Sequence, residues 1–327
     1  MIRWGIVGTG MIARRFAEAV NKMEDREIAV WGAASRSYAN AYRFCIEHQV
    51  PQAYENYDDM LASKDIDAVY IAVPHPWHCE YAAKAICAGK HVLCEKPMAM
   101  NSEQVQYLID LAYDHNVFLM ENMWTRFLPV TKQVRRWIEE GDIGEVRMMI
   151  TNYGFIARGF PDSRWFNKEL GGGALLDIGV YPISYTTMLM GFDIDDIQTC
   201  AYIGETGVDE HHNIWMRYRG GRFVSSISCS VVDEFGSDMI ISGEYGKIEV
   251  DSFQKSERAR LYRNGREPEE ICLPHMVNGF EYSIREACHC IELGEIENPR
   301  LPWVVTLGNM KIMDDIRRKW GLRYPCE

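Results

Sequence analysis

A strand that runs directly into a glycine-rich turn and then into a helix is the feature that most constrains this chain. Apolar residues through Val7 are followed at once by Gly8-Thr9-Gly10-Met11-Ile12-Ala13. Gly8 permits a tight turn, Gly10 lets the backbone approach a pyrophosphate, and Ala13 allows the helix to pack closely on the strand. The helix N-terminus attracts negative charge. This order of elements predicts a dinucleotide-binding loop.

Short apolar runs alternate with amphipathic helical patterns over the first third of the chain. The runs are almost continuously apolar, as in strands buried on both faces of a parallel sheet. They cover residues 4–7, 28–34, 68–73, 91–94 and 117–120. The alternation predicts an α/β fold that begins with a dinucleotide-binding Rossmann domain, a doubly wound parallel sheet, over residues 1–122.

The pattern changes near residue 123. Alternating polar and apolar runs then follow one another without intervening helices, at 146–155, 197–203, 213–218, 223–232, 237–242 and 247–250. Such runs predict a large, mostly antiparallel open sheet. With helical patterns at 130–140, 280–293 and 304–320, they predict a C-terminal α+β domain over residues 123–327, to which we assign substrate binding and oligomerisation. The open sheet predicts a homodimer or a higher homo-oligomer.

Composition excludes several partners. The chain carries 35 Lys+Arg and 47 Asp+Glu, a formal net charge of −12, which argues against nucleic acid and anionic membranes. No apolar run approaches the roughly 20 residues that span a bilayer. The ten cysteines are scattered without a C-x-x-C pair, and no signal peptide is evident, so we expect a reduced, cytoplasmic protein.

Two clusters of possible metal ligands are better explained as structural residues. His211-His212 lacks ligand spacing on a helix, and Cys288-His289-Cys290 is too short to chelate with good geometry. We therefore expect no metal.

The end of the second strand bears on the choice of cofactor. A carboxylate there would bind the ribose hydroxyls of NAD, but none occurs between Glu27 and Glu47. Ser35 and Arg36 stand there instead, and an arginine can bind a 2′-phosphate bidentately. This favours NADP, with NAD still possible. The alternative is that Arg36 is a solvated arginine that only stacks on the adenine.

Glu95 and Lys96 directly follow the predicted strand 91–94. In an open α/β sheet, ligands bind outside the carboxyl ends of the strands, so these residues are expected beside the nicotinamide. Lys96 would place a positive charge near the reacting oxygen. The alternative is an ordinary solvated lysine.

A second constellation begins with Gly171-Gly172-Gly173. Asp177 and Tyr181 follow at a spacing of i, i+4, which places them on one face of a helix, and the glycines allow close backbone approach. A tyrosine has an ordinary pKa of about 10, and a nearby ammonium lowers it by roughly 1–3 units. Tyr181 is thus a candidate acid/base, with a core aromatic as the alternative.

Taken together, these motifs resemble the Gfo/Idh/MocA oxidoreductase family. The matching segments are Gly8-x-Gly10-x-x-Ala13, Glu95-Lys96-Pro97, Gly172-Gly173-x-x-x-Asp177-x-Gly179-x-Tyr181 and Ser242-Gly243-x-x-Gly246-Lys247-Ile248. Most members have histidine at the position of Tyr181. Tyrosine there, together with Glu121-x-x-Trp124-Thr125-Arg126-Phe127-x-Pro129, resembles the branch of dimeric dihydrodiol dehydrogenases and NADP-dependent D-xylose dehydrogenases.

The resemblance implies a role for each candidate. Tyr181 exchanges the hydroxyl proton, Lys96 orients that hydroxyl, and Asp177 holds the substrate or the lysine. The implied cofactor contacts are Gly8, Thr9, Gly10, Met11, Ile12, Ser35, Arg36, Pro74, His75, His78, Glu95 and Lys96. Pro74-His75-x-x-His78 departs from the Pro-Asn-x-x-His of the wider family. The implied pocket residues are Trp124, Arg126, Phe155 and Trp165, with packing as the alternative for each.

These observations predict an NADP-preferring oxidoreductase. It would transfer a hydride between the nicotinamide and a ring hydroxyl of an aldose or a cyclic trans-diol. Two alternatives stay open at this point. One is an NAD-dependent polyol or inositol dehydrogenase, and the other is a nucleotide-sensing relative without enzymatic activity.

Overall fold

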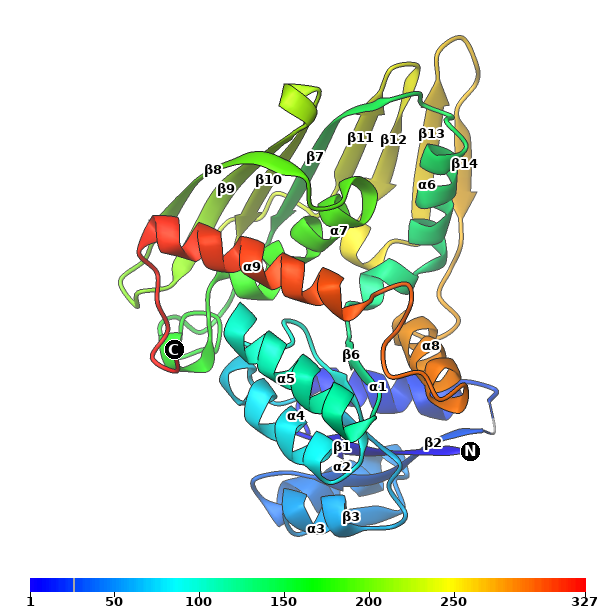
Figure 1. Ribbon diagram of the computed structural model, residues 1–327, viewed down its shortest axis with the longest axis vertical. Coiled ribbons are helices and arrows are strands. Elements are labelled where there is room, and N and C mark those ends of the chain that lie inside the picture. Colours follow the sequence, from blue (N-terminus) through cyan, green and yellow to red (C-terminus); the bar gives the residue numbers. More distant parts are fainter. Residues whose placement is uncertain (26) are drawn as a thin grey trace. The chain divides into compact units, whose positions relative to one another are not determined.

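The computed structural model describes residues 1–25 and 27–327 (Figure 1). Contacts divide the chain into two units. The first comprises Met1–Trp124 and Met276–Met310, and the second comprises Thr125–His275 and Lys311–Glu327. The expected boundary between residues 122 and 123 lies two residues before the observed division at Trp124 and Thr125, and Met276–Met310 returns to the first unit after the second has begun.

The first unit is built on a six-stranded parallel sheet in the order β3-β2-β1-β4-β5-β6. The strands are β1 (Ile2–Val7), β2 (Ile28–Ala34), β3 (Gln52–Tyr54), β4 (Ala68–Ile71), β5 (His91–Cys94) and β6 (Leu119–Glu121). The chain order reverses between β1 and β4, where such folds bind ligands at the carboxyl edge. The Rossmann-type prediction is confirmed.

In the described part of this unit, five helices connect the strands. They are α1 (Met11–Lys22), α2 (Tyr38–His48), α3 (Tyr57–Ala62), α4 (His78–Cys87) and α5 (Ser102–His115). α1 buries Phe16, Ala19 and Val20 on its apolar face. At the start of α5, the Asn101 side chain accepts a hydrogen bond from the Gln104 backbone N–H, as expected of a helix cap.

The later segment of the first unit contributes α8 (Phe280–Glu292) and the start of α9 (Trp303–Trp320). α8 packs on α1. Arg15 donates a hydrogen bond to the Asn278 carbonyl at 2.8 Å, and the Phe280 ring lies 5.1 Å from that of Trp124. These long-range contacts explain why Met276–Met310 belongs to this unit.

The second unit is built on an eight-stranded sheet in the order β14-β13-β12-β11-β7-β10-β9-β8. The strands are β7 (Val146–Gly154), β8 (Ile194–Ile203), β9 (Asp209–Tyr218), β10 (Phe223–Ser230), β11 (Met239–Gly243), β12 (Gly246–Asp251), β13 (Arg258–Arg263) and β14 (Glu269–Cys272). Neighbouring strands are antiparallel except β7 and β10, which are parallel. The prediction of a mostly antiparallel sheet is confirmed.

Helices cover one face of this sheet, as Figure 1 shows for α6 (Pro129–Glu139) and α7 (Val180–Met190). α6 contacts β13, and α7 is tied to β10 by a 2.9 Å hydrogen bond between the hydroxyls of Thr186 and Ser225. A five-residue π-helix, Leu175–Gly179, leads directly into α7.

The sequence patterns did not predict β3, β13 and β14. β3 has only three residues, which is too short for a period to appear. β13 reads RARLYR, so that only Ala259 and Leu261 face the core among charged neighbours. No helix within residues 1–25 and 27–327 combines the length and apolarity needed to cross a bilayer.

Candidate active site

The glycine-rich turn lies at the carboxyl end of β1, as predicted. Gly8 has a φ of +90°, and a Cβ there would lie 2.5 Å from the Ala72 carbonyl oxygen, so only glycine fits. A Cβ on Gly10 would meet no atom within 4 Å. Gly10 and Met11 are exposed, and Thr9 and Ile12 are partly exposed. The turn therefore leaves open space in front of the unpaired N–H groups that begin α1.

Ser35 and Arg36 follow β2 directly, on the strand next to this turn. The Ser35 hydroxyl accepts a hydrogen bond from Thr9 Oγ1 at 3.4 Å, and the Arg36 side chain is exposed. Two neighbouring strands thus bring a hydroxyl pair and a guanidinium to one edge of the sheet.

Glu95 and Lys96 follow β5. The Glu95 side chain is buried, and its Oε1 accepts hydrogen bonds from the Tyr70 hydroxyl and from Asn122 Nδ2. Burial raises the pKa of the Glu95 carboxyl above its ordinary value. Lys96 is half-buried and precedes a cis peptide bond to Pro97. Glu95 thus faces the core of the unit and fixes the backbone that presents Lys96.

Three predicted cofactor contacts lie after β4. Pro74 is exposed, whereas His75 and His78 are buried. The ring nitrogens of His78 lie 2.8 Å from the carbonyl oxygens of Pro97 and Val73. Burial lowers the pKa of His78 to about 4, so the imidazole is neutral at pH 7. His78 therefore joins the end of β4 to the Lys96-Pro97 turn.

In the second unit, Asp177 lies in the π-helix before α7. The guanidinium of Arg164 donates to both of its carboxylate oxygens, at 3.3 and 3.5 Å. The Asp177 side chain is 6% exposed and that of Arg164 is 45% exposed. The same guanidinium lies 3.7 Å from the centre of the Trp165 ring. A buried carboxylate is thus paired with a partly solvated cation held on an aromatic face.

Tyr181 lies in the first turn of α7 and is 8% exposed. Its ring centre is 6.2 Å from that of Tyr153, which is itself 6.2 Å from Phe155. Phe155 in turn meets Trp165 edge to face at 4.9 Å. These contacts join Tyr181, Tyr153, Phe155 and Trp165 into one aromatic cluster, and Asp177 is linked to it through Arg164.

Trp124 and Arg126 are engaged elsewhere. Trp124 is 4% exposed and packs in the first unit against Phe280 and the guanidinium of Arg15. Arg126 belongs to the second unit and donates from Nη1 to the Ser184 carbonyl of α7 at 3.1 Å. These contacts suit packing and support of α7, and a role in the substrate pocket stays a prediction for both residues.

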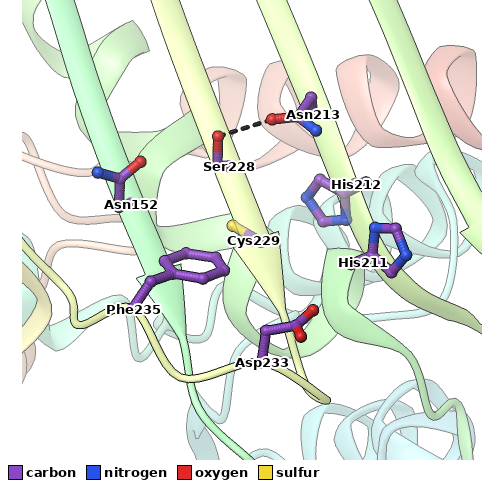
Figure 2. A pocket seen from close by; sticks show the side chains of 8 residues that line it. All are labelled: Asn152, His211, His212, Asn213, Ser228, Cys229, Asp233 and Phe235. Atoms are coloured by element: carbon purple, nitrogen blue, oxygen red, sulfur yellow. Dashed lines mark hydrogen bonds between the residues drawn. The ribbon is translucent and has the colours of Figure 1, made fainter.

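A separate pocket of about 370 Å³ opens on the second sheet (Figure 2). It is lined by Asn152, His211, His212, Asn213, Ser228, Cys229, Asp233 and Phe235. Ser228 Oγ donates a 2.7 Å hydrogen bond to Asn213 Oδ1 across neighbouring strands. None of these residues was predicted as a site residue.

Comparison with known proteins decides the family. Residues 2–123 match the Gfo/Idh/MocA family described as "Oxidoreductase family, NAD-binding Rossmann fold". Residues 131–249 match the C-terminal domain of the same family. Trans-1,2-dihydrobenzene-1,2-diol dehydrogenase of Danio rerio is 33% identical over 99% of this chain and 98% of the relative. The chain belongs to the Gfo/Idh/MocA oxidoreductase family.

Two further proteins are similar to this chain along nearly their whole length. The scyllo-inositol 2-dehydrogenase (NADP(+)) IolU of Bacillus subtilis (strain 168) is 33% identical over 100% of this chain and 99% of the relative. The solved structure of KijD10, a 3-ketoreductase from Actinomadura kijaniata in complex with NADP and TDP-benzene, is 28% identical, covers 97% of each chain and has a TM-score of 0.86. The fold and the enzymatic class predicted from the sequence are confirmed.

The sequence motifs missed Arg164 and Tyr153. Arg164 lies in a loop 13 residues before Asp177, and Tyr153 lies near the end of β7. Neither has a spacing that would reveal its partner, because folding alone brings these segments together. Among residues 1–25 and 27–327, no three His, Cys, Asp or Glu side chains form a group able to hold a metal ion.

Proposed function

We propose that this oxidoreductase prefers NADP and acts on a ring hydroxyl of an aldose or a cyclic trans-diol. The observation that carries the proposal is the aromatic cluster around Tyr181, to which the buried Asp177 is linked through Arg164. Aromatic faces suit the apolar side of a ring, and a carboxylate suits its hydroxyls. The named substrates of the relatives, a cyclic diol and an inositol, support this class.

The glycine-rich turn fits the pyrophosphate of a dinucleotide. Open space at Gly10 and the N–H groups that begin α1 form an anion site of the kind that phosphates occupy. When bound, the nicotinamide supplies the hydride acceptor or donor. The chain supplies the anion site, the support for Lys96 and the proton exchange.

In the proposed reaction, the Tyr181 hydroxyl exchanges the proton of the substrate hydroxyl. In the oxidative direction the substrate carbon gives up a hydride, for which the bound nicotinamide would be the acceptor, its oxygen gives its proton to the deprotonated Tyr181 oxygen, and a carbonyl forms. Lys96 favours the proton-accepting form of the tyrosine through its positive charge. Asp177, held by Arg164, orients the substrate ring, and Phe155 and Trp165 line its apolar side.

A panel of substrates tests this proposal. Aldoses, inositols and trans-dihydrodiols would each be offered with NADP and with NAD, and nicotinamide reduction would be followed by absorbance. The proposal expects turnover with at least one aldose or trans-diol and higher kcat/KM with NADP. Turnover of an inositol with NAD alone would identify a polyol dehydrogenase instead. The absence of turnover with every pair would contradict the proposal.

Arg36 is proposed to bind the 2′-phosphate of NADP. Arg36→Ala is expected to weaken NADP binding by roughly 10–100-fold, since a charge-assisted hydrogen bond contributes about 1.5–3 kcal/mol. NAD, which lacks this phosphate, should bind with nearly unchanged affinity. Fluorescence titration with both nucleotides measures the effect, and Arg43→Ala, an exposed arginine on α2, is the control. Equal weakening of both nucleotides would rule out this role for Arg36.

We also propose that the uncovered face of the second sheet binds a second copy of the chain. Ile240, Ile150, Ser226 and Trp215 stand in register across β11, β7, β10 and β9. Ile150 is 38% exposed and Trp215 is 43% exposed. This row is a partly apolar surface of the kind that neighbouring subunits cover.

Ile150→Glu is expected to shift the protein from a dimer or higher oligomer to a monomer, because it places a charge in the centre of that row. Sedimentation velocity at micromolar concentration measures the change. Tyr113→Glu, on the exposed side of α5, should leave the oligomer intact. A wild-type monomer at this concentration would overturn the proposal.

All ten cysteines are present as free thiols. This supports our proposal that the protein works in a reducing compartment such as the cytoplasm.

A further inference from the structure

A buried Asp–His pair on β9 contacts the segment that carries Asp177 and Tyr181. Asp209 and His212 are 0% and 1% exposed, and His212 Nδ1 lies 3.0 Å from Asp209 Oδ2. The same carboxylate oxygen accepts a 2.7 Å hydrogen bond from the Leu175 backbone N–H. Leu175 is the first residue of the π-helix that contains Asp177. Asp209 therefore accepts a hydrogen bond from one of the N–H groups that the start of a helix leaves without a partner inside the helix.

The glycines of this segment make room for the pair. A Cβ on Gly173 would lie 2.3 Å from Asp209 Oδ1, and a Cβ on Gly179 would lie 3.1 Å from His212 Nε2. Gly173 also has a φ of +111°. Gly173 and Gly179 thus allow the Asp209 and His212 side chains to approach the backbone closely, a contact within the second unit that the sequence alone did not reveal.

The C-terminal residues of the second unit close the same region. The Trp320 ring lies 5.3 Å from that of His212. The Tyr324 hydroxyl donates a 2.6 Å hydrogen bond to the Gly172 carbonyl. The imidazole of His212 is held between the Trp320 ring on one side and the backbone at Gly179 on the other.

We propose that Asp209 and His212 are positioning residues for the reaction. Asp209 holds the start of the π-helix through Leu175, and His212 holds the Asp209 carboxylate and fills the space at Gly179. Together they set the positions of Asp177 and of Tyr181, which follows Gly179 by two residues. This inference rests on the proposed function, because it gives Tyr181 and Asp177 a task that needs accurate placement.

His212→Leu and His212→Asn form a matched pair of variants. The asparagine Nδ2 occupies the place of the His212 Nδ1 and can still donate to Asp209, whereas leucine cannot. We expect His212→Leu to lower the single-turnover rate constant of nicotinamide reduction by roughly 10–100-fold. His212→Asn should recover most of that loss. Stopped-flow absorbance measures both quantities that matter, the rate constant and the amplitude.

The rate constant reports how well Tyr181 is placed, and the amplitude reports the fraction of the protein that is folded and active. A variant that merely folds less completely gives a smaller amplitude with an unchanged rate constant. A variant that misplaces Tyr181 gives a lower rate constant at full amplitude. NADP binds to the first unit in our proposal, so its affinity should be unchanged in all variants. A wild-type rate constant in His212→Leu, or equal rate constants in the leucine and asparagine variants, would overturn the inference.

Gly179→Ala provides a second, independent test. Its methyl group would lie 3.1 Å from both His212 Nε2 and Leu175 Cδ1 and 3.2 Å from His212 Cε1 in the wild type, and we expect a roughly 10-fold lower rate constant. Asparagine does not reach the Nε2 position. In the His212→Asn background, the same methyl group should therefore lower the rate constant by less than about 3-fold. Equal losses in the two backgrounds would contradict the inference.

The failure of this inference can be distinguished from that of the proposed function. If Tyr181→Phe loses turnover while the His212 variants react normally, only the positioning role fails. If Tyr181→Phe reacts normally, the proposed function itself fails.

Discussion

Replacing Tyr181 by phenylalanine is expected to lower kcat by roughly 10²–10⁴-fold, because it removes the hydroxyl that we propose exchanges the substrate proton. The ring stays, so its packing on Tyr153 and the affinity for NADP should change little. Steady-state kinetics with the best substrate of the panel, together with fluorescence titration of NADP, measure the two effects.

Tyr185→Phe is the matched control for this variant. Tyr185 lies on the same helix one turn later and is 1% exposed, so the same atom is removed from a neighbouring buried tyrosine. Its turnover should stay within a few-fold of the wild type. Near-normal turnover of Tyr181→Phe would remove Tyr181 from the mechanism.

Replacing Lys96 by methionine is expected to lower kcat by roughly 10²–10³-fold and to move the pH–rate profile for oxidation to higher pH. Methionine keeps the length of the side chain but not the positive charge, which in our proposal favours the proton-accepting form of the tyrosine. Lys96→Arg keeps the charge and should recover part of the loss. The exposed Lys64, changed to methionine, should behave as the wild type.

The double variant tests whether Lys96 and Tyr181 act on the same proton. If they do, kcat of the double variant Lys96→Met, Tyr181→Phe should be about as low as kcat of the worse single variant. The effects of residues that act as a unit are not additive. If the double variant instead loses kcat by the product of the two single losses, Lys96 has a separate role. An unchanged pH–rate profile in Lys96→Met would contradict the proposed effect of its charge.

The nucleotide-binding half was predictable because its signals are local. Gly8, Gly10 and Ala13 encode the turn and the start of α1 within six residues, and the missing carboxylate near Arg36 is visible in the sequence itself. The apolar runs gave most of the parallel strands for the same reason, because burial on both faces leaves a continuous pattern. β3 was not predicted, because a strand of three residues is too short to show a pattern of apolar residues.

The second unit depends more on contacts between distant segments. Asp177 and Tyr181 were found through their motif, but Arg164 and Tyr153 reach them only after folding. The parallel pairing of β7 with β10 joins strands about 75 residues apart, which no local pattern encodes. His212 was interpreted as structural from its spacing, and the structure places its side chain next to Asp209 and to Gly179, just before α7.

The first unit shows the same limit in the segment Met276–Met310. Its helical pattern was predicted, but its place was not, because the contacts of Phe280 and Asn278 with Trp124 and Arg15 join residues more than 150 positions apart. Packing between distant helices follows from shape and burial, which a single sequence does not display.

The most direct test of the account follows a deuterium label. The best ring-hydroxyl substrate of the panel, deuterated at the carbon that bears the hydroxyl, would be incubated with NADP and the enzyme, and the nicotinamide product analysed by mass spectrometry. We predict that the wild type transfers the label to the reduced nicotinamide and that Tyr181→Phe does so at least about 100-fold more slowly. Unlabelled reduced nicotinamide, or equal transfer rates in the two proteins, would contradict the account.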